Sequence, residues 1–267
     1  MKKCFVMMVA VMLAGCEKMV LDEDVKNGNV VMRVTRAGGS LGDACTRLNV
    51  AVFDENGQKV KTVSQTLSDD GFGTVGLSLP PETYSVAMVA HSCAGAATVT
   101  SADKVTFPSN KVTDTFCWYG TIDASENKQN VNISLQRCVA MVRLHISSER
   151  DDIASLKFYY LGGSSTLSVI DGYGAVNSKQ TEYRTWNSEG VYELYTIPHA
   201  DEDVITKMTI TAMDASDNVV GEYTLEDIPV RTNHITEYEG DLFGTGGGVL
   251  LVVSVNPQWS GVMEYEF

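Results

Sequence analysis

Two short stretches hold residue types that could do catalytic or metal chemistry. Residues 162–166, GGSST, place serines beside glycines, but they lack the closing glycine of the G-x-S-x-G nucleophile turn, and no helix pattern follows. Residues 54–57, DENG, begin like a calcium loop, yet the glycine comes fourth, whereas such a loop needs oxygen ligands at positions 1, 3 and 5 and glycine at position 6. We interpret both stretches as turns.

The histidines also fail to form a catalytic or metal-binding pattern. They are His91, His145, His199 and His234. None belongs to an HExxH motif or to a close pair that would aim two imidazoles at one metal. His199 precedes the acidic residues 201–203, which fits either a surface cation site or a solvated acidic loop. The sequence predicts no enzyme, no cofactor and no metal.

Cys16 is the residue with the clearest chemistry. Lys2 and Lys3 precede a short apolar run, and Leu13-Ala14-Gly15 leads directly to Cys16. A charged start, an apolar run and small residues are typical of an export signal, and a run of about 10 residues is too short to span a bilayer stably. Leu-Ala-Gly-Cys resembles the bacterial lipobox, in which the cysteine is acylated and becomes the first residue after cleavage. The alternative is an ordinary secretory signal with an incidental cysteine.

Composition limits the partners of the exported chain. The formal charge of −14 becomes −16 when Lys2 and Lys3 leave with the signal, so nucleic acid and anionic lipid head groups are disfavoured. The lipid on Cys16 would then be the membrane anchor. The remaining cysteines, Cys45, Cys93, Cys117 and Cys138, could form disulfides in an exported protein, with three pairings open. Four buried free thiols are the alternative.

Period-two alternation and frequent turn residues predict an all-β fold. Residues 47–63 form the clearest hairpin, with Leu48, Val50 and Val52 on one face and Val60 and Val63 resuming that face after the turn at residues 54–57. Residues 130–146 are long enough to pass from one sheet into another. We predict a signal peptide at 1–15, a flexible tether at 16–28, and β-sandwiches at 29–137 and 138–267, the second ending in a strand pair.

Two aromatic clusters could stack on sugars, which makes a glycan-binding surface lipoprotein the alternative function. They are Phe116, Trp118 and Tyr119, and Phe158, Tyr159 and Tyr160. Alternation sends neighbouring side chains to opposite faces, so each cluster puts at most two rings on one side. Core packing is the competing explanation for both clusters.

Five stretches resemble the fimbrial subunits of Bacteroidetes, the fimbrillin-like group of FimA shaft and FimB/Mfa2 proteins. They are RLNVAVFDENGQKV (47–60), SLPPETYSVAMVAHS (78–92), KFYYLGGSSTLSVIDGYGAVNSKQTE (157–182), YTIPH (195–199) and IPVRTNHITEYEGDLFG (228–244). With the lipobox they span nearly the whole chain, and the match is closer to FimB/Mfa2-like lipoproteins than to shaft proteins.

The resemblance implies two tandem transthyretin-like β-sandwiches and a structural or adhesive role in a surface fimbria, as an anchor or accessory subunit. The protein would be lipid-anchored at the outer membrane and assembled with other fimbrial subunits by strand exchange, with host or bacterial surface ligands as further partners. Shaft proteins of the group are cut after an arginine, and Arg36 is positioned for such a cut, with Arg33 as a poorer choice. Alternatively, Arg36 is an exposed loop residue.

Two segments have the form that strand exchange needs. Residues 29–36 alternate Val30, Met32 and Val34 on one face and precede a glycine-containing turn, so they could be the strand that is removed. Residues 244–259 join a glycine hinge to an apolar strand, whose candidate donor residues are Val249, Leu251, Val253 and Val255. The alternative keeps this strand within its own sandwich.

Overall fold

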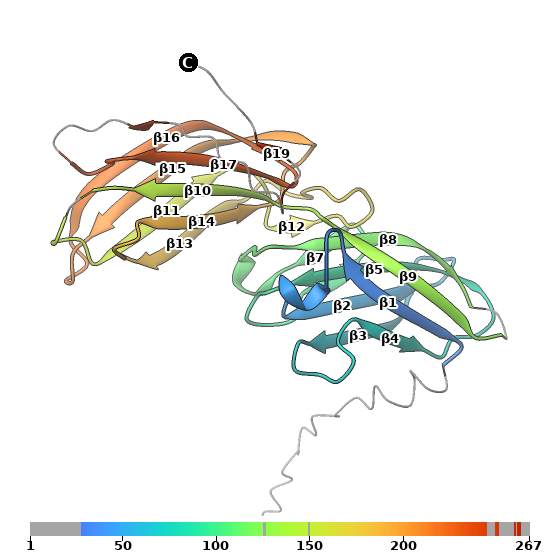
Figure 1. The fold of residues 1–267 in the computed structure, drawn as a ribbon. Coiled ribbons are helices and arrows are strands. Elements are labelled where there is room, and N and C mark those ends of the chain that lie inside the picture. The colour runs from blue at the N-terminus through green and yellow to red at the C-terminus, as the bar shows by residue number, and fades with distance from the viewer. Residues whose placement is uncertain are drawn as a thin grey trace, which may run out of the picture.

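The computed structural model describes residues 28–124, 127–148, 150–244, 249–250, 259 and 261–262. In these residues nearly all regular structure is β-strand, gathered in two bodies that lie side by side (Figure 1). The helical structure described consists of two single turns, η1 Leu41–Asp43 and η2 Pro108–Asn110. The predicted all-β class is confirmed. No helix in the described part of the chain is long and apolar enough to cross a membrane.

The N-terminal sandwich is one folded-over sheet of seven strands, in the order β3-β2-β5-β8-β9-β1-β4. These strands are β1 Val30–Arg36, β2 Arg47–Phe53, β3 Lys59–Thr66, β4 Thr74–Leu77, β5 Thr83–His91, β8 Phe116–Asp123 and β9 Gln129–Arg137. β8 and β9 pair at two positions, Phe116 with Arg137 and Cys117 with Gln136. Beyond this short contact the sheet divides into two layers that enclose a core.

Alternating side chains of the two layers fill that core. β1 contributes Val30, Met32 and Val34, and β2 contributes Leu48, Val50 and Val52, all buried. A strand places every second residue on one face, so three apolar side chains from each strand point into the same space. The hairpin prediction for residues 47–63 is confirmed in β2 and β3, with one correction. Val60 is 48% exposed, because it lies on an edge strand near the turn and outside the core.

A third layer covers the outer face of β2, β5 and β8. Its strands are β6 Thr98–Ser101, β7 Lys104–Thr106 and β12 Thr166–Leu167, in the order β12-β7-β6. β12 comes from the second half of the chain and pairs with β7, Leu167 opposite Val105. The two halves of the chain therefore share a sheet, and an apolar cluster beneath it includes Ala51, Val89, Val105 and Leu167.

The C-terminal sandwich encloses its own core between two sheets. Its strands are β10 Ala140–Ile146, β11 Ser155–Leu161, β13 Lys179–Thr185, β14 Val191–Thr196, β15 Glu202–Met213, β16 Val219–Arg231, β17 His234–Gly240, β18 Val249–Leu250 and β19 Gly261–Val262. One sheet has the order β14-β10-β17-β18, with β19 also on β17, and the other has the order β13-β11-β15-β16. Phe158 and Tyr160 are completely buried between them.

The long apolar segment at residues 130–146 is two strands. β9 ends at Arg137 in the N-terminal sandwich, and β10 begins at Ala140 in the C-terminal one. The chain does pass from one sheet to another here, but the strand breaks at Cys138 and Val139. The predicted limits of the tether and of the two domains stay predictions, because the shared β7–β12 pairing gives the halves a common layer.

Candidate functional site

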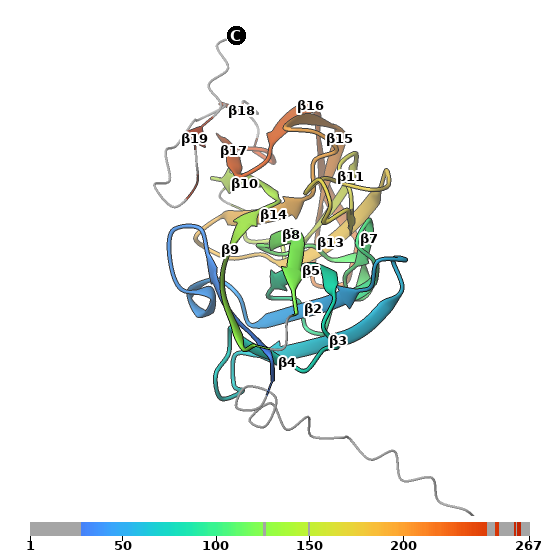
Figure 2. The ribbon, with the colours of Figure 1, turned by 90° about the vertical axis from the view of Figure 1, so that its right-hand side faces the viewer.

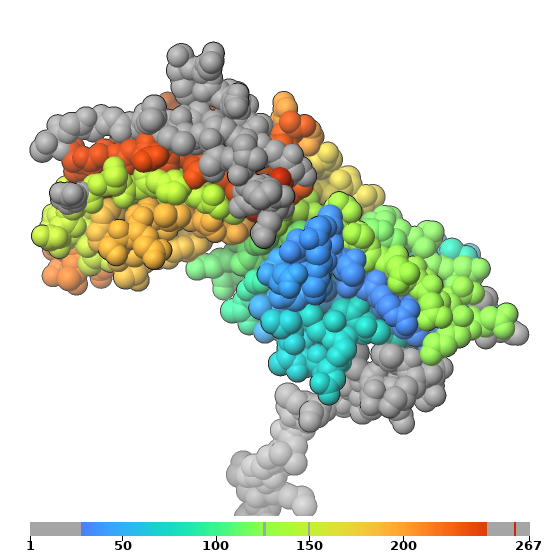
Figure 3. Space-filling model, in the orientation of Figure 1, coloured from blue at the N-terminus to red at the C-terminus, as the bar shows by residue number. Residues whose placement is uncertain are grey.

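β1, the strand predicted to be removable, lies inside its sheet. It runs parallel to β9 over its whole length, from Val30 opposite Gln129 to Arg36 opposite Leu135, and antiparallel to β4. Val30 and Met32 are completely buried. In the space-filling view β1 forms a blue stripe beside the light green of β9 (Figure 3). Removing β1 would leave unpaired N–H and C=O groups on β9 and β4 beside an apolar groove.

Arg36 closes β1 in a tight turn. Its backbone pairs with Gly39, and Gly38 has a φ of +82°, a conformation that glycine adopts without steric cost. The guanidinium donates to the carbonyl oxygens of Ser40, at 3.1 Å from Nε, and Ala37, at 3.2 Å from Nη1. The side chain is 9% exposed. The interpretation of Arg36 as an exposed loop residue is therefore wrong, whereas cutting after Arg36 is untested. Arg33 is exposed.

The two outermost candidate sites are only partly described. Cys16 lies outside the described residues. Val249 belongs to β18, which pairs antiparallel with β17, Val249 opposite Gly240. β19 pairs in parallel with the start of β17, so both strands lie beside β17 (Figure 2). Leu251, Val253 and Val255 lie outside the described residues, and the donor-strand hypothesis stays a prediction.

An ion pair at the junction of the two sandwiches was missed by sequence reasoning. Arg137, at the end of β9, donates to both carboxylate oxygens of Asp114, at 2.7 and 2.9 Å, and to Asn233 Oδ1 at 3.0 Å. Trp259 lies against it, with the Arg137 Cζ 3.9 Å from the indole ring centroid. The sequence clue was an arginine at the position that follows Ile133 and Leu135 on the apolar face of the alternation, directly before the predicted boundary at residue 138.

Cys45, Cys93, Cys117 and Cys138 are free thiols and all buried. Burial raises the pKa of Cys45 to about 12 and also raises the pKa of Cys93. Burial likewise raises the pKa of Cys138, and its neighbour Cys117 adds to the shift. The structure thus has the four cysteines as buried free thiols, which was the alternative to disulfides, and it gives no disulfide pairing.

His91 is a buried, neutral structural residue. Its Nδ1 accepts from the Cys93 N–H at 3.1 Å, and its Nε2 lies 3.0 Å from Asn49 Oδ1 and 3.2 Å from the Ala97 nitrogen. Protonation would set a second N–H against the Cys93 N–H. Burial, helped by the charge of Arg47, lowers the pKa of His91 to about 4.

The His91 environment predicts acid lability. The pKa of His91 is about 4 in the folded state and 6.5 in the unfolded state. The contribution of neutral His91 to the free energy of unfolding is therefore fully present above pH 6.5 and is lost as the pH falls toward 4. The full loss is about 3 kcal/mol at 1.36 kcal/mol per pKa unit. Urea unfolding at pH 7 and pH 4.5 measures it, with His91→Gln as the control that should lack this decline. An equally steep decline in His91→Gln would contradict the assignment.

The remaining candidate groups have structural partners. His199 Nδ1 lies 2.7 Å from Asp203 Oδ2, and Asp201 pairs with Arg231 at 3.1 Å. Among the described residues no group of three His, Cys, Asp or Glu side chains could hold a metal ion. Phe116, Phe158 and Tyr160 are buried in the sandwich cores. The other three rings of the two clusters, Trp118, Tyr119 and Tyr159, are half-buried.

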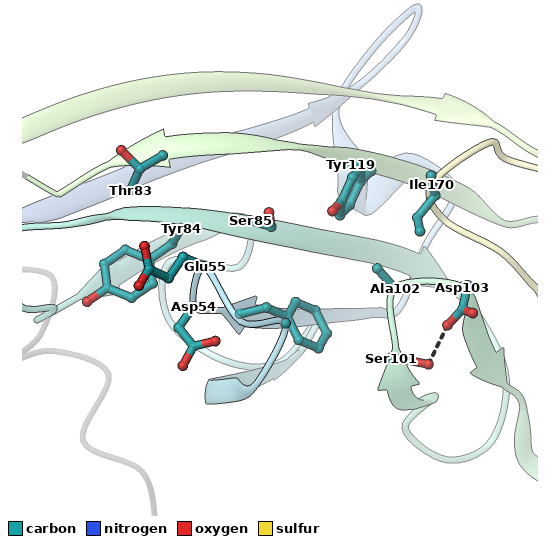
Figure 4. A pocket seen from close by; sticks show the side chains of 12 residues that line it. Asp54, Glu55, Thr83, Tyr84, Ser85, Ser101, Ala102, Asp103, Tyr119 and Ile170 are labelled. Carbon is teal, nitrogen blue, oxygen red and sulfur yellow. Dashed lines mark hydrogen bonds between the residues drawn. The ribbon is translucent and has the colours of Figure 1, made fainter.

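An open hollow lies at the edge of the N-terminal sandwich (Figure 4). Its volume is about 480 Å³, and its lining includes Thr83, Ser85 and Tyr119 from β5 and β8. The lining holds three carboxylates, from Asp54, Glu55 and Asp103, and no basic side chain. An anionic ligand is therefore disfavoured at this place.

Residues 21–262 match the family described as fimbrillin-A associated anchor proteins Mfa1 and Mfa2. A candidate adhesin from Bacteroides ovatus is 12% identical with a TM-score of 0.53, over 89% of this chain and 95% of that chain. A candidate polysaccharide-binding protein from Bacteroides thetaiotaomicron is 12% identical with a TM-score of 0.51, over 90% and 98%. The fimbrial anchor protein Mfa2 from Porphyromonas gingivalis is 9% identical with a TM-score of 0.45, over 86% and 97%. No curated protein matches.

The fold defines the class of this protein, and the family match defines its family. The sheet order, the two cores and the likeness to the Bacteroides structures define a β-sandwich protein of two joined sandwiches. The family match spans most of the chain, so the chain belongs to the family of fimbrillin-A associated anchor proteins. It is a fimbrial anchor or accessory subunit.

Proposed function

We propose that this protein is the lipid-held end of a surface fimbria, fixed to the outer membrane through Cys16 and joined to other subunits by strand exchange. The observation that supports this most is the position of β1. It is an N-terminal strand, close in sequence to the lipid, and it is also an interior strand of its sheet. A chain that keeps β1 keeps its lipid, and a chain that loses β1 loses both.

The contacts of Arg36 favour retention of β1. A protease that cuts after arginine must take the side chain into its own pocket, but the Arg36 guanidinium is held by two carbonyl oxygens and is largely covered. Asp43 adds a weak ion pair at 3.9 Å. Cleavage would need this turn to open first. We therefore assign the protein to the anchor position, where the lipid and β1 both remain.

If β1 is retained, its place in the sheet is filled, so this subunit exchanges a strand with its neighbour at the edge of a different sheet. A sheet edge offers a row of N–H and C=O groups to a strand from a neighbouring subunit. β17 carries the short β18 and β19 pairings at its two ends on one side and β10 along the other. That edge of β17 is where we place the exchange with the next subunit.

The anchor proposal predicts that Cys16→Ser abolishes membrane attachment, because a chain with a formal charge of −14 is repelled by anionic lipid head groups and needs the lipid to stay at a membrane. Radiolabelled palmitate feeding followed by fractionation measures label and location together. Cys4→Ser, within the apolar run of the signal, is the matched control and should keep both. Undiminished label in Cys16→Ser would rule out this anchor.

A further inference from the structure

Two guanidinium groups lie over one aromatic ring where the N-terminal sandwich meets the C-terminal one. The Arg36 Cζ is 5.8 Å from the centroid of the Phe116 ring, and the Arg137 Cζ is 4.7 Å from it. Phe116 is 1% exposed, so both contacts are shielded from water. A cation is attracted to the face of an aromatic ring, and the attraction is stronger where water is excluded. Phe116 thus connects the end of β1 to Arg137.

Arg137 is fixed in place by hydrogen bonds from both sandwiches. Asp114 precedes β8 in the N-terminal sandwich, and Asn233 lies in the turn between β16 and β17 in the C-terminal one. Asn233 itself has a φ of 60°, and its N–H donates to the Val139 carbonyl at 2.8 Å. With its edge occupied by hydrogen bonds, the flat guanidinium offers its faces to aromatic rings.

Trp259 is buried at this junction of the two sandwiches. It is 7% exposed, and its ring lies 6.4 Å from Tyr195 with the planes 30° apart. The same apolar cluster holds Cys138, Met141 and Ile235. Two residues further on, β19 pairs with the first residues of β17, next to this cluster. The Trp259 ring, the Arg137 guanidinium and the pairing of β19 all lie near the first residues of β17.

We propose that the sandwich junction is a docking site for the chain's own C-terminal segment, with Trp259 as the anchor, and that docking steadies the end of β1 through Arg137, Phe116 and Arg36. Trp259 is connected to Arg36 through Arg137 and Phe116. Energetic coupling of this kind is reciprocal, so lifting the C-terminal segment loosens β1, and loosening β1 weakens the hold on Trp259.

The consequence for assembly rests on the proposed function. In a subunit that keeps β1, the docked Trp259 protects the strand whose loss would release the lipid. Contact with a neighbouring subunit at β17 would compete with this docking. The coupling itself is a property of the single chain, and it can be measured without any fimbria.

Hydrogen exchange of the full exported chain tests the coupling. We expect Trp259→Ala to lower the protection of the Arg36 and Ala37 amides, which bond to Gly39 and Leu135, by about 10-fold. Trp259→Phe keeps a ring over Arg137 and should stay within about twofold of the wild type. Trp186→Ala is the matched control, because Trp186 stacks on Tyr192 in the other sandwich and should leave these two amides unchanged.

A second variant separates coupling from general weakening. In a Phe116→Leu background, Trp259→Ala should cause no additional loss at Arg36 and Ala37, because the connecting ring is gone. Unchanged protection in Trp259→Ala, or a loss at Arg36 and Ala37 no larger than the loss shared by the other amides of the chain, would overturn the proposal. So would an equal further loss in the Phe116→Leu background. None of these outcomes bears on the lipid anchor, which Cys16→Ser tests separately.

Discussion

A chain that begins at Ala37 is expected to lose its cooperatively folded N-terminal sandwich. β1 buries Val30, Val31, Met32 and Val34, each at 5% exposure or less. Covering a side chain of this size contributes roughly 1.5 to 3 kcal/mol, so the four contribute about 6 to 12 kcal/mol. That range approaches the whole stability of a typical domain. Circular dichroism melting of the shortened chain measures the effect.

A peptide of residues 28–36 added in trans should restore cooperative melting, because it supplies both the ladder to β9 and β4 and the apolar face. The same peptide with Met32→Asp is the matched control and should fail, since Met32 is completely buried. A shortened chain that melts like the full chain would show that β1 is dispensable, and strand exchange at this position would be excluded.

Deletion of the chain from Gly246 onward is expected to lower the melting temperature by about 10 °C. Removing a buried tryptophan alone costs about 3 to 5 kcal/mol, and 1 kcal/mol shifts the melting temperature of a chain this long by roughly 2 to 4 °C. The deletion also removes the β18 and β19 pairings to β17. Differential scanning calorimetry of the exported chain, with and without the segment, measures the shift.

Trp259→Ala should reproduce much of this loss, because Trp259 is the buried contact of the segment at the sandwich junction. The contrary result is a truncated chain that melts unchanged but no longer enters fimbriae. That pair of observations would establish the C-terminal segment as a donor strand and would end the interpretation that it pairs within its own sandwich.

Much of the fold could be predicted because the strands alternate cleanly. Leu48, Val50 and Val52 were placed on one buried face by sequence alone, and the Asp54 turn that follows closes as expected, with Asp54 Oδ1 accepting from the N–H groups of Asn56 and Gln58. Alternation and turn residues depend on near neighbours in the chain, so a short stretch of sequence is enough to show them. The period of two also distributed the aromatic rings correctly, with Phe158 and Tyr160 facing the core.

The layers above the sandwich could not be predicted in this way. Asn49 and Ala51 alternate with the core residues of β2 and would be exposed in a two-layer sandwich, yet they are 2% and 0% exposed. Ala51 shares an apolar cluster with Leu167 of β12, more than 100 residues away in the sequence, and Asn49 contacts His91 and Ala97. A period-two pattern gives no information about which distant residues pack on a strand. For the same reason the sequence did not reveal that Arg137 bonds to Asp114 and Asn233.

The candidate site was predicted in outline and not in its contacts. The sequence placed Arg36 at the end of an alternating strand, as in the structure, but gave no sign that its guanidinium bonds back to the turn. Backbone carbonyl oxygens have no sequence pattern, so the side chain that donates to them is found only in the structure. In the anchor role that we propose, this turn is the feature that favours retention of β1.

Mass spectrometry of the N-terminus of the native protein tests whether the protein keeps both its lipid and β1. We expect one species that begins at an acylated Cys16 and continues uncut through Arg36 and Ala37. A native protein that begins at Ala37, without lipid, would contradict it, because β1 and the anchor would then have been removed together.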